Sequence, residues 1–148
     1  MKSWRLFGLL IIAAHWVVAV WHLVLLAKIF PTPDNGANWL PIVFVSAAHL
    51  GLSIVWWTVS IRLAGWVLLV LLSTALGAGV YEHFPGPGPN SIFRVPPTNW
   101  TAAFRASVFV LLVLEILGCW LGLRSVRSKA RDKNGSGALP QATTVELS

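Results

Sequence analysis

One carboxylate lies within a run of aliphatic side chains in the C-terminal half of the chain. The stretch "VLLVLEILG" spans residues 110–118, and Glu115 is its only charged residue. If this run crosses a membrane, a charge near its middle is costly, and such residues usually face the interior of a helix bundle. Glu115 then either pairs with a protonated histidine or stays protonated itself. It is therefore the first candidate for a functional group.

Two histidines are suitable partners for this carboxylate. His15 and His49 lie in two other apolar runs, and at about 1.5 Å per residue both fall at a similar depth to Glu115. Ser73 and Thr74 lie near the middle of a further run, so every apolar run brings a polar group to one level. We predict an intramembrane polar cluster of these five residues. In the simplest interpretation they only hydrogen-bond helices together, as polar residues do in membranes.

The histidines also suggest cofactor chemistry. His15 and His22 are seven residues apart and share a helix face, and His49 would add a third imidazole to one cavity. Two imidazoles from two helices could ligate haem b axially, and a non-haem metal held with Glu115 is a further alternative. The small residues of "STALGAG", at 73–79, either let another helix approach closely or form a groove for a flat ligand such as a quinone. The sequence does not decide between haem, a non-haem metal, a quinone and no cofactor.

A third group of polar residues ends the third apolar run. Tyr81, Glu82 and His83 precede a connection of about twenty residues that is rich in proline and glycine. Connections of that length are often functional or disordered. The three side chains could bind a metal or guide a proton, or they could simply form a solvated helix end.

The composition indicates how these residues are held. The chain has 148 residues, of which 56% are hydrophobic and 11% are charged, which is too apolar for a soluble domain of this size. Four runs are long enough, or nearly so, to cross a hydrocarbon core of roughly 30 Å. They span residues 6–27, 40–59, 63–80 and 106–123. We predict an all-α membrane protein with four transmembrane helices in an up-down bundle over residues 1–124, followed by a basic and then disordered tail at 125–148.

Several short motifs recur in the same order. "RLFG" at Arg5 returns as "RLAG" at Arg62, and "FPTP" at Phe30 returns as "FPGP" at Phe84. The chain could therefore be an internal repeat of two tandem helical hairpins related by an axis along the membrane normal. Interface chemistry alone also favours arginine, proline and tryptophan at such places. The chain is Trp-rich, with nine tryptophans, and we interpret most of them, including Trp56, as an aromatic belt at the membrane surfaces.

Basic residues predict the orientation. Eight of the eleven Lys and Arg residues lie on the side that holds both termini, and three lie on the other side. The positive-inside rule then places both termini in the cytoplasm, with the chain in the cell membrane. The net charge of +6 reflects this topology and contact with anionic lipid in the bilayer, so no nucleic-acid partner is expected. Cys119 is the only cysteine, which excludes an intramolecular disulfide.

Three classes of function remain. The chain has no nucleophile elbow, phosphate loop or established metal-ligand spacing. This argues against hydrolysis or phosphoryl transfer of the soluble-enzyme type, and whether the protein is an enzyme of another type stays open. The first class is a binding or accessory subunit of a membrane complex, with a membrane-protein partner. The second is a proton-linked small-molecule carrier that uses Glu115 and the midplane histidines and would need to form a homo-oligomer. The third is a membrane oxidoreductase or electron carrier that holds haem, metal or quinone through His15, His22 and His49.

Overall fold

The computed structural model describes residues 2–30, 39–86 and 90–135. This part of the chain forms four α-helices and no strand. The helices are α1 (Lys2–Ile29), α2 (Leu40–Thr58), α3 (Ile61–His83) and α4 (Thr101–Gly135). Each is long and apolar enough to cross a membrane. The prediction of an all-α, four-helix membrane protein is therefore confirmed.

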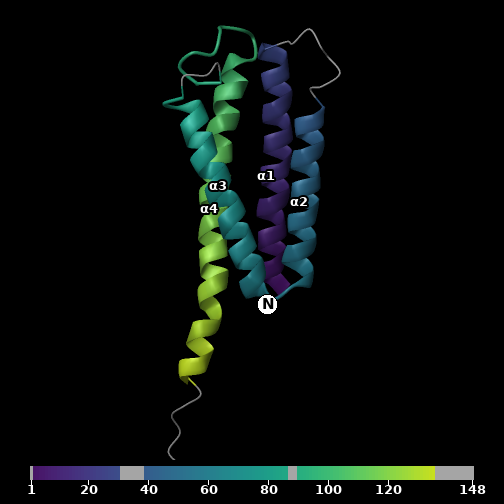
Figure 1. The fold of residues 1–148 in the computed structure, drawn as a ribbon, viewed down its shortest axis with the longest axis vertical. Coiled ribbons are helices and arrows are strands. Elements are labelled where there is room, and N and C mark those ends of the chain that lie inside the picture. Colours follow the sequence, from purple (N-terminus) through teal and green to yellow (C-terminus); the bar gives the residue numbers. More distant parts are fainter. Residues whose placement is uncertain (1, 31–38, 87–89, 136–148) are drawn as a thin grey trace, which may run out of the picture.

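The helices run alternately up and down (Figure 1). Each packs against the next along the chain, and α1 also packs against α4, so the contacts close a ring. The α1 helix begins and α4 ends at the same end of the bundle, which we call the terminal end. The opposite end, where α1 and α3 stop, is called the loop end. The most extensive helix pair is α3 with α4, whereas α2 is the least buried of the four spans.

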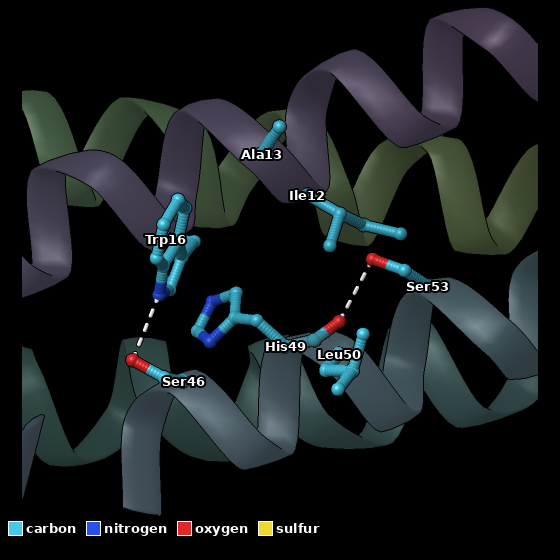
Figure 2. A pocket seen from close by; sticks show the side chains of 7 residues that line it. All are labelled: Ile12, Ala13, Trp16, Ser46, His49, Leu50 and Ser53. Atoms are coloured by element: carbon cyan, nitrogen blue, oxygen red, sulfur yellow. Dashed lines mark hydrogen bonds between the residues drawn. The ribbon is translucent and has the colours of Figure 1, made fainter. Parts of the chain in front are cut away.

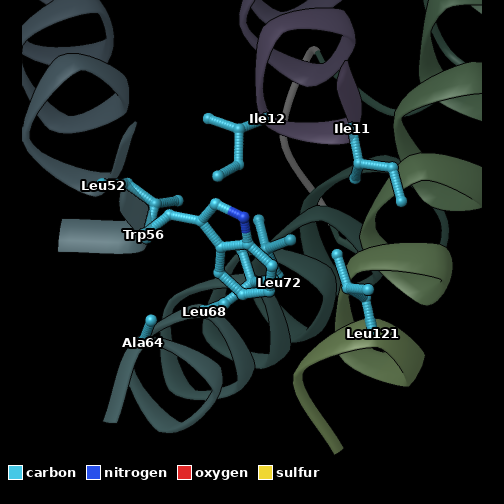
Figure 3. Packing of buried hydrophobic residues seen from close by; sticks show 8 residues of the cluster. All are labelled: Ile11, Ile12, Leu52, Trp56, Ala64, Leu68, Leu72 and Leu121. Carbon is cyan, nitrogen blue, oxygen red and sulfur yellow. The ribbon is translucent and has the colours of Figure 1, made fainter. Parts of the chain in front are cut away.

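A hydrophobic cluster fills the terminal half of the bundle (Figure 3). Trp56 is fully buried at its centre, and its indole N–H donates to the carbonyl oxygen of Arg5 at 2.9 Å. Gly8 makes this position possible, because a Cβ atom there would stand 2.2 Å from the Trp56 ring. The interpretation of Trp56 as an aromatic-belt residue is therefore wrong. It lies near the predicted interface in depth, but it faces the core.

Arginine closes the same end of α2. The Arg5 guanidinium donates to the carbonyl oxygens of Trp56 at 2.9 Å and Val59 at 3.0 Å, and also to that of Trp57. The last carbonyl groups of a helix have no partner within the helix, and a cation is favourable at a helix C-terminus. Arg5 thus joins the start of α1 to the end of α2.

The closest helix approach lies between α3 and α4. A Cβ atom on Gly122 would stand 2.8 Å from the carbonyl oxygen of Gly65, so the two backbones touch where neither residue has a side chain. The small residues at 73–79 do not fill this role. Within the described chain, Gly77 has no heavy atom within 4 Å of the place where a Cβ would be, and Ser73 is exposed.

Residues 90–100, the second described part of the connection between α3 and α4, fold onto the loop end. Of these, Ile92 and Val95 are buried, and they pack with Leu25, Ile29 and Phe104 of the helices in a second hydrophobic cluster. Arg105 of α4 donates to the carbonyl oxygen of Ile92 at 3.0 Å. This part of the loop is therefore a cap on the bundle.

The helices extend beyond the four apolar runs. The α3 helix reaches His83, and α4 runs from Thr101 to Gly135, whereas the predicted tail begins at residue 125. Hydropathy marks only the part of a helix that crosses lipid, and charged residues continue a helix readily in water. The rest of the predicted tail, residues 136–148, lies outside the described residues.

Substitution of Gly122 tests the α3–α4 contact. Gly122→Ala should lower the free energy of unfolding by about 1–3 kcal/mol, because the new methyl group overpacks the contact. The matched control is Gly51→Ala, where nothing lies within 4 Å of the new atom, so stability should be unchanged or slightly raised. Circular dichroism during titration with SDS in mixed micelles measures both values. Equal stability of the two variants would contradict the close contact.

Candidate functional site

Three helices bring a histidine pair and the carboxylate together at the middle of the bundle. His15 Nδ1 of α1 lies 2.7 Å from His49 Nε2 of α2. His15 Nε2 lies 3.5 Å from Glu115 Oε1 of α4. His49 Nδ1 in turn lies 2.6 Å from the carbonyl oxygen of Val45, one turn earlier in α2. His15 and Glu115 are buried and His49 is half-buried.

The direction of each hydrogen bond follows from the carbonyl at one end. The carbonyl oxygen of Val45 only accepts, so His49 Nδ1 carries a hydrogen and, in a neutral ring, His49 Nε2 is an acceptor. His15 Nδ1 must therefore donate to His49. A hydrogen bond between His15 Nε2 and Glu115 Oε1 then requires one further proton, because both atoms are otherwise acceptors, and with that proton the pair has no net charge whichever atom holds it. We call this chain of atoms from Glu115 through His15 to His49 the relay.

The link to Glu115 is the loosest part of the relay. At 3.5 Å it is longer than the usual 2.7–3.2 Å for an N–H···O bond. The second oxygen, Oε2, lies near Gly79 of α3, where a Cβ atom would stand 3.8 Å away. At this position α3 therefore presents no side chain to the Glu115 carboxylate.

A groove opens beside the other end of the relay (Figure 2). It has a volume of about 350 Å³ and lies between α1 and α2. Its lining residues are Ile12, Ala13, Trp16, Ser46, His49, Leu50 and Ser53. Most of its surface is apolar, and several of these side chains, including Trp16 and Leu50, are exposed at the outer face of the bundle. The groove therefore faces the surrounding lipid at the depth of His49.

The two serines of the groove leave different hydrogen-bonding groups free for a ligand. The Trp16 indole N–H donates to Ser46 Oγ at 3.0 Å, which leaves the Ser46 hydroxyl hydrogen free to donate. Ser53 Oγ donates to the backbone carbonyl of His49 at 2.8 Å, which leaves its lone pairs free to accept. The groove thus offers one donor, Ser46, and one acceptor, Ser53. Figure 2 shows Ser46 beside Trp16 and Ser53 beside Ile12.

The other two histidines form a second cluster at the loop end. His22 of α1 and His83 of α3 are buried, with ring centroids 5.0 Å apart in an edge-to-face arrangement. The His22 ring also stacks on Phe104 at 4.9 Å. His22 Nδ1 lies 2.8 Å from Ser107 Oγ, and His83 Nδ1 lies 2.9 Å from the carbonyl oxygen of Asn90.

The hydrogen-bond partners also determine which ring nitrogens of this cluster carry a hydrogen. Ser107 Oγ donates to the carbonyl oxygen of Phe104 at 2.7 Å, so it accepts from His22 Nδ1. His83 Nδ1 must likewise donate to Asn90. Within the described part of the chain, Nε2 of both rings has no hydrogen-bond partner, and no fully buried side-chain nitrogen or oxygen is unpaired. Both Nε2 atoms therefore retain an accessible lone pair.

The structure separates several residues that the sequence groups together. Ser73 and Thr74 are exposed; Ser73 contacts Cys119 at 3.4 Å, and Thr74 donates to the carbonyl of Val70 in its own helix. They lie at the predicted depth but point away from the relay. Tyr81 and Glu82 are also exposed, so only His83 of that group enters a cluster.

The histidines are not arranged as three ligands of one cofactor. His22 pairs with His83, not with His15 and His49. The ring nitrogens of His15 and His49 are 2.7 Å apart, whereas two axial nitrogens each about 2.0 Å from one metal are about 4 Å apart. Among the described residues, no three His, Cys, Asp or Glu side chains gather as a metal site. The observed His15–His49 spacing fits a shared proton and does not fit an axially ligated metal.

Sequence reasoning missed Ser107, Ser46 and Ser53. A signal was present for the first, because Ser107 precedes Glu115 by eight residues and so lies on the same face of α4. Ser46 and Ser53 flank His49 at spacings of three and four residues, which also places them on one helix face.

Comparison with protein-family models, with curated proteins and with solved structures finds no match for this chain. The two histidine clusters and the groove are therefore the features that bear on its function.

A double-mutant cycle tests the contact between His15 and Glu115. His15→Leu should lower the free energy of unfolding by about 1–3 kcal/mol, because it leaves buried polar groups without a partner. Adding Glu115→Leu should restore part of this loss, so the two effects should not add. Ser73→Ala, at an exposed serine, should leave stability unchanged. Strict additivity of the two substitutions would show that His15 and Glu115 do not interact.

Proposed function

We propose that this protein is a proton-linked binding protein or carrier of the cell membrane, whose ligand is a small amphipathic weak acid. One observation carries the proposal: the relay leads from buried Glu115 through His15 to His49, which lines the groove between α1 and α2. A site for structural bonding alone would not need its last member at the wall of a groove. The groove of about 350 Å³ is large enough for a small ligand.

A negative charge in the groove would draw a proton toward His49. When the proton shared with Glu115 settles on His15 Nε2, His15 Nδ1 can release its own hydrogen to His49 Nε2. Two hydrogens shift and no atom is gained or lost. The result is an imidazolium at His49 beside the anion and a carboxylate at Glu115, which then takes up a proton from water.

The rest of the groove suits the same ligand class. The free hydroxyl hydrogen of Ser46 can donate to a carboxylate or similar acceptor. The apolar lining of Ile12 and Leu50 accommodates a hydrophobic body. A weak acid with an apolar body uses both features, and it can cross lipid to reach an opening at this depth.

A second candidate function is an accessory subunit that binds another membrane protein. The observation that favours it is the outward face of α2, since Phe44 is 71% exposed and Leu50 is 65% exposed while only Leu52 and Trp56 of this helix are buried. A partner protein or a second copy of the chain on this face would also cover the groove. The oxidoreductase class has less support, because the structure does not gather His15, His22 and His49.

The proposed orientation places both termini in the cytoplasm. The terminal end holds most of the basic residues, and it carries Arg5 and Arg124, whose charged groups lie close to the helix ends there. Arg124 stacks over the Trp4 and Trp120 rings at 5.0 and 5.3 Å. An end rich in arginine and tryptophan suits the cytoplasmic interface with anionic lipid.

Proton uptake on ligand binding tests the primary proposal. Benzoate added to the protein in lightly buffered nanodiscs should cause uptake of about one proton per bound molecule, by linkage between the two equilibria. The readouts are a pH indicator and equilibrium binding of labelled benzoate, with empty nanodiscs subtracted. Benzamide, an uncharged analogue, should cause no uptake.

Glu115→Gln is the decisive variant for this measurement. Glutamine keeps the size and can still donate to His15 Nε2, but it cannot exchange a proton, so uptake should disappear. Ser73→Ala, outside the relay, should behave as the natural chain does. Undiminished proton uptake in Glu115→Gln, or benzoate binding without uptake in the natural chain, would rule out the proposed linkage.

Photo-crosslinking tests the accessory-subunit candidate. A benzophenone amino acid at Phe44 of α2 should give one discrete adduct in native membranes, at twice the chain mass for a second copy or at another mass for a different partner. The same probe at Val113 of α4, which is also exposed at 56%, should give only lipid adducts. Identical patterns from the two positions would show that α2 has no dedicated partner.

A further inference from the structure

We infer that protons reach Glu115 from the loop end of the bundle, by way of His83 and His22 and past the position of Gly79, where α3 has no side chain. This inference rests on the proposed proton linkage, because it names the side from which Glu115 takes up its proton. It concerns the second histidine cluster, which the relay itself does not use.

The two clusters share α1 and α4, while His49 of the relay lies on α2 and His83 of the second cluster lies on α3. His15 and His22 lie on one face of α1, and Glu115 and Ser107 lie on one face of α4. Ser107 bonds His22 as Glu115 bonds His15. At about 1.5 Å per residue, the eight residues between Ser107 and Glu115 correspond to about 12 Å along α4.

Polar groups are buried almost entirely in the loop half. Of the seven polar or charged residues that are buried in the described chain, six lie at or beyond the relay toward the loop end, and Ser125 lies toward the terminal end. The terminal half is instead filled by the apolar cluster around Trp56 and Leu68, both fully buried. An apolar packed core excludes water and offers no proton acceptor, so the terminal end is closed to protons.

The histidines of the loop end are prepared to receive a proton. Each ring donates its Nδ1 hydrogen to an oxygen atom. His22 donates to Ser107 Oγ, and His83 donates to the backbone carbonyl oxygen of Asn90. Each therefore keeps an Nε2 lone pair, which has no partner in the described chain. His83 ends α3 beside the connection that caps the bundle, so this ring is the closer of the two to the aqueous surface.

Gly79 lies on α3 one turn before His83 and beside Glu115. Outside the adjacent residues and the backbone of the same helix turns, a Cβ atom there would have only Glu115 Oε2 within 4 Å among the described residues, at 3.8 Å. Gly79 precedes His83 by one turn of α3, or about 6 Å along the axis. One or two water molecules span such a distance between polar groups. Any larger side chain at residue 79 would stand in their place.

Hydrogen–deuterium exchange of His15 tests the route without any ligand. His15 Nδ1 carries a hydrogen in the resting relay, so its ¹⁵N–¹H signal can be followed by solid-state NMR of the protein in bilayers after transfer to D₂O. The signal is identified by its loss in His15→Gln. We expect Gly79→Leu to slow the exchange by about tenfold, because opening of the route becomes less frequent.

Matched variants separate obstruction from a general change in the bundle. Gly77→Leu adds the same side chain to the same helix, where nothing lies within 4 Å, and should leave the exchange rate unchanged. Gly79→Ala adds a methyl at ordinary contact distance, so it should fold normally and slow exchange to a smaller extent. His83→Phe should also slow exchange, because it removes the outer proton acceptor.

Two results would overturn the route. Exchange as fast in Gly79→Ala, Gly79→Leu and His83→Phe as in the natural chain would mean that protons arrive elsewhere, for example through the groove at His49. Equal slowing by Gly77→Leu would mean that the effect is not obstruction. Failure of the proposed function gives a different result, namely proton uptake with benzoate that persists in Glu115→Gln while the exchange rates still follow the size of residue 79.

Discussion

Every polar group buried in this bundle has to find its hydrogen-bond partner within the protein, because lipid offers none. The described part of the chain meets this constraint, since no fully buried side-chain nitrogen or oxygen is without a partner. His15 satisfies it from both ring nitrogens at once, through His49 of α2 and Glu115 of α4. A single residue of α1 thereby fixes the rotation of three helices. The groove beside His49 and the contact of Glu115 with Gly79 both follow from that rotation.

The two halves of the bundle satisfy the constraint differently. In the terminal half, the core side chains are apolar, and polar side chains join the helices. Arg5 binds the carbonyl groups at the end of α2, and Trp4 of α1 donates to Ser125 of α4 at 3.1 Å. In the loop half, the helices are joined by imidazoles and a carboxylate, which can gain and lose protons. The core cluster of the first half contains neither a histidine nor a carboxylate and supplies stability by apolar packing. The second half holds the groups that can change charge, and it is the half on which the capping connection folds.

The lengths of the apolar runs and the depth of each polar residue could be predicted from the sequence. The rotation of each helix about its own axis could not. The four spans and the common level of His15, His49 and Glu115 follow from counting residues along helices. In a membrane protein the faces toward lipid and toward the core are both apolar, so hydropathy does not show which way a helix turns. This is why Ser73 lies at the predicted level but points outward, and why His22 shares a face with His15 but pairs with His83.

The close contacts between helices could not be predicted from the sequence either. Small residues occur at 73–79 and again at Gly65 and Gly122, and only the second set meets another backbone. Nothing in the local sequence distinguishes them, because the difference lies in where α3 and α4 cross. Trp56 has the spacing of an interfacial residue and becomes a core residue only because Gly8 faces it. Packing partners decide these roles, and they come from distant parts of the chain.

The neutrality of the resting relay has a consequence for the proposed function. The chain of donors from His49 to Glu115 places one proton between His15 and Glu115, so the cluster carries no net charge. Moving that proton to His49 separates two charges in a medium that solvates neither, which is unfavourable on its own. An anion in the groove offsets this cost by lying beside the imidazolium, and uptake of a proton by Glu115 removes the remaining charge. The same low dielectric that forces the buried groups to pair would therefore prevent proton movement when the groove is empty and allow it when a weak acid is bound.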